Sequence, residues 1–200
     1  MSKHIPPPGA RSINEILAEA RTHLTRITPA QLLTELQSPS SHGPTHIVDI
    51  RPAAQREREG ALIFPDAPLF DASTTKHKIH IIERNVLEWR LDPQNEARIK
   101  EIVDEFGYDT RVVVSCSEGY TSSLAARELQ KLGLSRATDL EGGYWAWKRT
   151  KIRVYSKTFA LGRNESDITM KLKDSQKEVI ATSNGSMPMT HVQLPLSKTY

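Results

Sequence analysis

Cysteine, aromatic side chains and long apolar runs are all scarce in this sequence. The chain of 200 residues has one cysteine, 6% aromatic residues and 38% hydrophobic residues, with a mean hydropathy of -0.48. One cysteine excludes an internal disulfide and any zinc site built from several cysteines. No apolar run approaches the length needed to cross a bilayer, so we expect no membrane partner.

A strong excess of one charge is missing as well. The formal net charge is +3 and the sequence pI is about 9.0, without a dense run of lysine and arginine. The most basic stretch, 149–157, favours a solvated face or tail, and we expect no nucleic-acid partner. The N-terminus has Pro6-Pro7-Pro8 where a secretion signal would have an apolar segment, so we expect a cytoplasmic, reducing location.

The chemistry of the chain is concentrated in residues 112–126. A β-branched run ends at Cys116, a short polar loop containing Gly119 follows, and apolar residues then recur at helical spacing, as at Ala125 and Leu129. This order predicts a strand, a loop and a helix. Backbone N–H groups of the loop and the positive end of the helix dipole would favour an anion at the sulfur. The same field favours the thiolate, which is the nucleophilic form of cysteine.

A lone cysteine is more often a buried small hydrophobic side chain than a nucleophile. Cys116 follows a strand and precedes a loop of glycine and hydroxyl residues, and this position makes it the candidate catalytic residue. Gly119 allows a positive φ if the turn requires one. Thr121 and Ser122 add hydroxyl donors, and either is suited to cap the helix.

Three segments together resemble the single-domain rhodanese-like sulfurtransferases. The active-site loop of that family is a cysteine, two variable residues, a glycine, one variable residue and then threonine, serine or arginine. Cys116, Gly119 and Thr121 occupy these positions. His46–Arg51 resembles the family's second strand with its Asp-x-Arg ending, and Glu141–Trp147 resembles its closing Gly-Gly turn and aromatic helix.

The resemblance covers residues 22–150 and implies a domain organisation. Residues 1–21 are expected to be a tail with a short amphipathic helix, and residues 151–200 a C-terminal extension that is largely flexible. The implied fold is α/β, a rhodanese-like domain with a central parallel sheet and helices on both faces. Its ligand would bind beyond the carboxyl ends of the strands.

The resemblance also implies a sulfurtransferase that moves a sulfane sulfur through a Cys116 persulfide. The donor would be thiosulfate or another small anionic or persulfide compound, and the acceptor a thiol, a protein or cyanide. No metal or organic cofactor is implied. The residues of the active-site loop would bind the substrate, namely Ser117, Glu118, Gly119, Tyr120, Thr121 and Ser122.

Two charged residues after the second strand are expected to support the loop. We expect Asp49 and Arg51 to tie the end of their strand to neighbouring loops, with Glu57 or Glu59 as a partner of Arg51. The family resemblance agrees, because the corresponding residues shape the site from outside.

The segment 81–91 is predicted to be a helix, because Ile82, Val86 and Trp89 fall at i, i+4 and i+7. Arg90 lies on it and is the preferred residue to reach over the active-site loop and bind the substrate anion. An arginine that is merely solvated is the alternative, since exposed charges contribute little.

Two departures from the family pattern affect these expectations. A histidine and an isoleucine often follow the glycine at Gly60, whereas Ala61-Leu62 stands here; a strand up to Phe64 is still expected, without the histidine's hydrogen bond. Glu118 stands where thiosulfate-using members often carry a basic residue, and its carboxylate would repel a dianion. We therefore expect weak thiosulfate activity or a different donor.

Two other functions compete with sulfur transfer. A tyrosine or dual-specificity phosphatase also uses a cysteine in a strand-loop-helix anion site. It needs an arginine after the cysteine and five further residues, and Ser122 stands at that place. The alternative from another class is a rhodanese-fold module that binds or regulates without catalysis. Retention of Cys116 counts against it, because non-catalytic versions often replace the cysteine.

Local signals predict the remaining elements. Ser12 and Glu15 form a capping box ahead of a helix with an apolar stripe, and Thr28 begins a second helix. The apolar spacing after Pro93 predicts a long helix that ends at Gly107. Strands are expected at 24–27, 46–50, 111–115 and 137–140.

Overall fold

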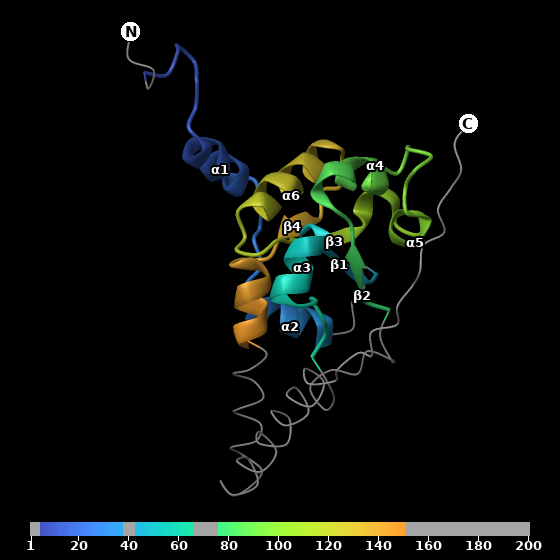
Figure 1. Ribbon diagram of the computed structural model, residues 1–200. Helices are drawn as coiled ribbons and strands as arrows, with labels where there is room; N and C mark the ends of the chain where they lie inside the picture. Colours follow the sequence, from blue (N-terminus) through green and yellow to red (C-terminus); the bar gives the residue numbers. More distant parts are fainter. Residues whose placement is uncertain (1–4, 38–42, 66–75, 151–200) are drawn as a thin grey trace, which may run out of the picture. The chain divides into compact units, whose positions relative to one another are not determined.

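The computed structural model describes residues 5–37, 43–65 and 76–150, all of which lie in one compact unit, Met1–Arg153. Its centre is a four-stranded sheet in the order β2-β1-β3-β4, with every neighbouring pair parallel (Figure 1). The strands are β1 (Thr45–Asp49), β2 (Lys78–Ile81), β3 (Arg111–Ser115) and β4 (Ala137–Asp139). Asp49 of β1 pairs with Ser115 of β3, so the residues that follow both strands emerge at one edge of the sheet.

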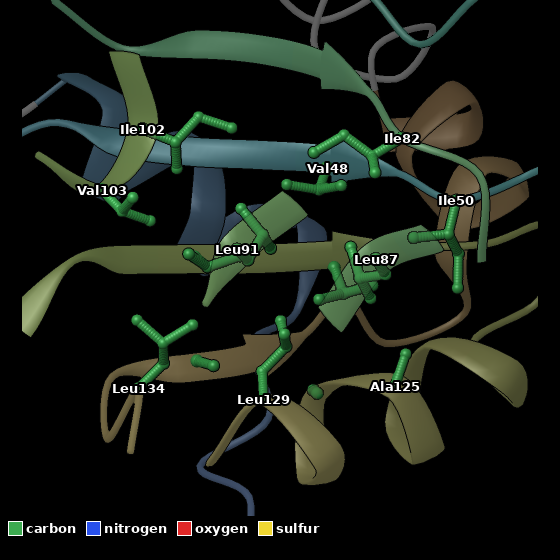
Figure 2. Packing of buried hydrophobic residues seen from close by; sticks show 14 of the residues in the cluster. Val48, Ile50, Ile82, Leu87, Leu91, Ile102, Val103, Ala125, Leu129 and Leu134 are labelled. Atoms are coloured by element: carbon green, nitrogen blue, oxygen red, sulfur yellow. The ribbon is translucent and has the colours of Figure 1, made fainter. Parts of the chain in front are cut away.

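One face of the sheet is covered by helices that follow β2 in the chain. Val112 and Val114 point to this face because side chains alternate along a strand. They pack against residues of α4 (Leu87–Leu91), α5 (Lys100–Val103) and α6 (Thr121–Lys131). Figure 2 shows residues of these three helices around Val48 of β1, which belongs to the same cluster. Leu87, Leu91 and Leu129 are fully buried there.

The opposite face is covered by α2 (Pro29–Gln37) and by the helix over 143–150. Ile47 and Val113 point to this face and share a buried cluster with Leu32, Tyr144 and Trp147. The expected parallel sheet with helices on both faces is therefore confirmed. A short helix, α3 (Ala53–Glu59), follows β1 and lies beside the carboxyl edge of the sheet.

Helix α1 (Ile13–Thr22) precedes the sheet and packs against α6. The predicted capping box is present, since Ser12 Oγ accepts from the Glu15 amide and the Glu15 carboxylate accepts from the Ser12 amide. Leu17 and Ala20 are buried in the contact, as expected. Ile13 of the same stripe is 63% exposed.

The segment 81–91 differs from its prediction. Residues up to Ile81 form the edge strand β2, a single turn of 3-10 helix follows at Arg84–Val86, and only Leu87–Leu91 is α-helical. Val86 and Trp89 are 41% and 58% exposed, whereas Leu87 and Leu91 are fully buried. Of the three residues in the predicted apolar face only Ile82 is buried, because leucines at a different spacing within the same segment face the core instead.

The long helix predicted after Pro93 is also wrong. Only α5 is α-helical there, and a 3-10 turn over Gly107–Asp109 follows it. The side chains of Asp92 and Asn95 accept hydrogen bonds from the amides of Gln94 and Ala97, two residues further on. Such bonds stabilise turns in competition with a helix.

Two further predictions need a correction or a limit. Residues 61–64 form no strand, and residues 24–27 contribute a single β-bridge, Ile27 to Leu140. The expectation for the extension 151–200 lies outside the described residues. Across the part of the chain that the structure describes, no helix is long and apolar enough to span a membrane.

Candidate active site

Cys116 lies where the sequence places it, between the end of β3 and the start of α6. Its side chain is half-buried, and the Gly119 amide donates a hydrogen bond to the sulfur at 3.2 Å. Ser122 Oγ lies 3.3 Å from the same sulfur. Gly119 has φ +80°, so the positive φ expected of this glycine is confirmed. The loop thus bends back until one of its own amides reaches the sulfur.

The first two carbonyl groups of the loop are held outward by the helix over 143–150. The Tyr144 amide donates to the Cys116 oxygen at 2.8 Å, and the Trp145 amide donates to the Ser117 oxygen at 3.1 Å. In a planar trans peptide the C=O and the following N–H point in opposite directions. The amides of Ser117 and Glu118 therefore point away from that helix, to the other side of the loop.

The Gly-Gly turn lets this helix approach the loop closely. Gly143 has φ +56°, and a Cβ there would collide with the Cys116 oxygen and lie 2.8 Å from the Ser117 carbonyl carbon. A Cβ on Gly119 would lie 2.8 Å from the Gly142 nitrogen. Glycine is therefore required on both sides of the contact by space as well as by backbone conformation.

The Gly119 carbonyl is held by side chains from the N-terminal segment and from α6. Arg21 Nη2 donates to this oxygen at 2.8 Å and Arg26 Nη2 at 3.3 Å, and Ser123 Oγ lies 3.0 Å from it. The Tyr120 amide belongs to the same peptide and points the opposite way. The carbonyl groups of Cys116, Ser117 and Gly119 are thus held outward, and the amides that follow them face the other side of the loop.

A buried carboxylate lies beneath the start of α6. Asp139, at the end of β4, is fully buried and receives Arg26 Nε at 2.8 Å and Arg26 Nη2 at 3.0 Å. Ser123 Oγ donates to it at 2.7 Å, and Ser122 Oγ lies 3.4 Å from it. Asp139 therefore fixes the hydroxyl groups of Ser122 and Ser123.

Asp49 and Arg51 form a second buried ion pair that extends to the loop. Arg51 Nη2 donates to Asp49 at 2.6 Å, and Arg51 Nη1 donates to Glu59 at 3.0 Å. The Ser117 hydroxyl donates to Glu59 at 2.7 Å and accepts from Gln55 Nε2 at 2.7 Å. The expected link from the strand end to a neighbouring loop is confirmed, with Glu59 as the partner of Arg51.

Glu59 stays ionised in this chain of contacts. Desolvation alone would raise the pKa of Glu59, but hydrogen bonds from Ser117, Arg51 and Gln55 outweigh it and hold the pKa below its ordinary value. A carboxylate that accepts from Ser117 fixes the side chain next to the nucleophile.

The remaining loop side chains face solvent. Glu118 and Thr121 are exposed, and Tyr120 is 56% exposed with the Arg21 guanidinium 5.5 Å from its ring centroid. Helix α6 begins at Thr121 without a side-chain cap, so neither Thr121 nor Ser122 caps it. Within the described ranges, the amides of Glu118, Tyr120 and Thr121 donate no hydrogen bond. These amides are available to a bound anion.

The structure places Arg90 in the last turn of α4. Its Nη1 donates to the Ala97 carbonyl oxygen at 2.7 Å. A role for Arg90 in binding the substrate stays a prediction. Among the described residues, no three histidine, cysteine, aspartate or glutamate side chains are grouped so as to hold a metal ion.

Sequence reasoning missed Arg21, Arg26, Asp139 and Gln55. The first two precede the recognisable loop by about a hundred residues, and no local pattern points to them. Asp139 carried a weak signal, because a carboxylate at the end of an apolar strand needs a cationic or hydroxyl partner once buried.

The comparison with family models decides the classification. The model of the rhodanese-like domain matches residues 28–150. The chain belongs to the rhodanese-like family. The rhodanese-like domain so defined includes the loop, α6 and the Gly-Gly turn, and it excludes α1 together with Arg21 and Arg26.

Two relatives of this rhodanese-like protein share about a third or less of the aligned sequence. The thiosulfate sulfurtransferase GlpE of Glaesserella parasuis is 33% identical over 54 residues, which are 27% of this chain and 50% of that protein. The chain therefore spans about half the length of this curated relative. A Rhodopseudomonas palustris protein of unknown function, described as a possible tyrosine phosphatase, is 29% identical. It has a TM-score of 0.54 and covers 73% of this chain and 96% of its own.

Proposed function

We propose that this protein is a sulfurtransferase in which Cys116 carries the transferred sulfur. The observation that supports the proposal most directly is the Gly119 amide donating to the Cys116 sulfur at 3.2 Å. Neighbouring loop carbonyl groups are tied outward, which leaves further amides for a second anionic atom beside the sulfur. The similarity to a thiosulfate sulfurtransferase over the matched residues agrees with this chemistry.

The first step is a displacement at sulfur. The Cys116 thiolate attacks the outer sulfur of the donor and forms a new S–S bond. The bond between that sulfur and the rest of the donor breaks, and its electron pair leaves with the rest of the donor. With thiosulfate the leaving group is sulfite; with a persulfide donor it is a thiolate. The product is a Cys116 persulfide, and the total charge is unchanged because the leaving group carries the electron pair away.

The loop amides would stabilise this intermediate. The terminal sulfur of a persulfide is an anion one bond beyond the cysteine sulfur, and the amides of Glu118, Tyr120 and Thr121 offer it donors. Amides that are already oriented stabilise such charge without reorganising during the reaction.

The second step needs a nucleophile from outside the chain. With a single cysteine, no second thiol of this protein can displace the sulfur from Cys116. A small thiol, a protein thiol or cyanide would attack the terminal sulfur and regenerate the thiolate. The acceptor is therefore proposed as a separate molecule.

The exposed carboxylate of Glu118 affects which sulfur donor the protein would use. It lies in the loop at the entrance to Cys116, and no ion pair of Glu118 occurs within the described ranges. A dianion such as thiosulfate is repelled by it more than a singly charged persulfide is. We propose that a persulfide is the better donor, with thiosulfate used weakly.

A phosphatase reaction is not supported. The Rhodopseudomonas protein is described as a possible tyrosine phosphatase, but this chain has Ser122 at the position where a phosphatase loop needs arginine. Ser122 is fully buried and lies beside Asp139, so it offers no bidentate grip on a phosphate.

The proposal is tested by intact-mass spectrometry of the full chain after incubation with thiosulfate or with a persulfide donor. Wild-type protein should gain about 32 Da, one sulfur atom, and reducing agent should remove it. The Cys116→Ser variant should gain nothing.

A matched control distinguishes a thiol that is accessible but does not accept sulfur from a thiol that reagents cannot reach. Wild-type protein is alkylated with iodoacetamide under the same conditions. If the thiol is alkylated but no donor adds sulfur, the sulfurtransferase proposal fails and the alternative of a non-catalytic binding module replaces it.

A further inference from the structure

Helix α1 delivers a guanidinium group to the active-site loop from outside the family's domain. The family match begins at residue 28, whereas Arg21 is in the last turn of α1. Its Nη2 donates to the Gly119 oxygen at 2.8 Å, and its Nε donates to Ser123 Oγ at 3.1 Å. Figure 1 shows α1 lying beside α6, so the helix is placed to make this contact.

The contact is made to the residue whose amide reaches the Cys116 sulfur. The amide of Gly119 donates to the Cys116 sulfur, and the carbonyl of the same residue accepts from Arg21. A donor pulling on that carbonyl fixes the Gly119–Tyr120 peptide, so the Tyr120 amide points to the opposite side. Arg21 thereby helps to hold the orientation of the Tyr120 amide, the loop amide that follows the one bound to the sulfur.

The charge of Arg21 is not cancelled by a carboxylate. Arg26 also contacts the Gly119 oxygen, but its charge is matched by the buried Asp139 at 2.8 Å. Throughout the described residues, Arg21 is in ion-pair contact with no acidic side chain, and its contacts are a carbonyl, a hydroxyl and the ring of Tyr120. The loop itself has no basic residue and has one carboxylate, Glu118.

We propose that Arg21 is a positioning residue of the Cys116 site, which supplies the positive charge that the loop lacks and selects anionic substrates. The proposal rests on the proposed function, because it concerns the approach of an anionic sulfur donor to Cys116. It assigns to α1 a part of the active site that the rhodanese-like domain alone does not contain.

The test compares two alkylating reagents of similar shape and different charge. With iodoacetate and with iodoacetamide alike, the Cys116 thiolate displaces iodide and forms a thioether. The ratio of the two rates reports the electrostatic potential at the sulfur and cancels the reactivity of the thiolate. Arg21→Gln should lower the iodoacetate-to-iodoacetamide ratio about threefold, as expected for loss of one nearby, partly screened charge.

Arg11→Gln is the matched control. Arg11 precedes α1, contacts it at Glu15 and Glu19, and is exposed, so its replacement removes the same charge beside the same helix. Its rate ratio should equal that of the wild type. Arg21→Lys keeps the positive charge but lacks the planar guanidinium group, and its rate ratio should equal the wild-type value.

Wild-type protein alone gives a further measurement if Arg21→Gln does not fold. The wild-type ratio should fall as salt rises from 0.05 M to about 1 M, because salt screens a partly exposed charge. An unchanged ratio in Arg21→Gln, an equal fall in Arg11→Gln, or a salt-independent wild-type ratio would overturn the proposal. Alkylation needs no sulfur transfer, so failure of persulfide formation alone overturns only the proposed function.

Discussion

His46 of β1 is buried away from the active site, beside a second histidine. It is 3% exposed, and its Nδ1 lies 2.9 Å from Nε2 of His80 on the neighbouring strand. Burial, followed by repulsion from His80 and Lys78, lowers the pKa of His46 from 6.5 to about 4. The folded protein therefore keeps this ring neutral well below the pH at which an unfolded chain would protonate it.

This difference predicts loss of stability in acid. Between about pH 6.5 and pH 4 the unfolded state binds the proton and the folded state does not, so the free energy of unfolding falls as the pH is lowered. The contribution of the neutral His46 ring to the free energy of unfolding is present in full above pH 6.5. The lowered pKa limits this contribution to about 3 kcal/mol. Urea denaturation at steps from pH 7.5 to pH 4.5 measures it.

Variants of two histidines identify the source of the pH dependence. His46→Gln should make the acid loss shallower, whereas His23→Gln, at the exposed end of α1, should leave it unchanged. His77 and His80 also have a lowered pKa through burial, so part of the slope should remain. Equal slopes for His46→Gln and the wild type would contradict the assignment.

At the scale of elements, the helix over 143–150 supports the loop through its first amides. Gly143→Ala should lower the free energy of unfolding by about 3 kcal/mol or more, because a Cβ at φ +56° would also meet the Cys116 carbonyl. Displacement of that carbonyl should also slow persulfide formation. Thermal or urea denaturation and intact mass measure the two effects.

Gly107→Ala is the matched control for this prediction. Gly107 has φ +53°, nearly the same conformation, but a Cβ there meets no atom within 4 Å. Its replacement should cost only the backbone strain, about 1 kcal/mol, and should leave persulfide formation unchanged. If both variants lose the same stability, the close approach of the helix to the loop is not what requires glycine at position 143.

Elements with two independent local signals were predicted well. The segment 112–133 has a β-branched run, a glycine loop and an apolar helical period that agree, and it folds accordingly. The segment 81–107 had an apolar period alone. Side-chain-to-backbone bonds of Asp92 and Asn95 then decided the structure, and no periodicity reports them.

At the scale of the whole molecule, the sequence predicted the fold and the place of Cys116 in it, but only half of the residues that surround this cysteine. Residues adjacent to Cys116 were found because loop and helix are contiguous. Arg21, Arg26 and Asp139 come from the first helix, the segment after it and the last strand. Only the strand order and the docking of α1 bring them together, and a single sequence does not report either.

Docking of α1 gives a prediction for the whole chain. Leu17 is 8% exposed on the side that meets α6, and Leu17→Ala should lower the free energy of unfolding by about 2–3 kcal/mol. Ile13, on the same helix and 63% exposed, is the control, and Ile13→Ala should change it by less than about 0.5 kcal/mol. Urea denaturation compares the two, and equal effects would show that α1 does not belong to the cooperative unit.

The donors around the sulfur are main-chain amides, and the partners that orient them lie outside the loop. Main-chain groups are present whichever side chain the gene specifies, so the exposed positions 118 and 120 can change without dismantling the anion site. On the proposed function, the reactivity of Cys116 depends on the main-chain amides and their partners, whereas the preference for a donor depends on exposed side chains such as those at positions 118 and 120. A lineage carrying this loop could acquire a new sulfur donor through single substitutions while every intermediate kept a working nucleophile.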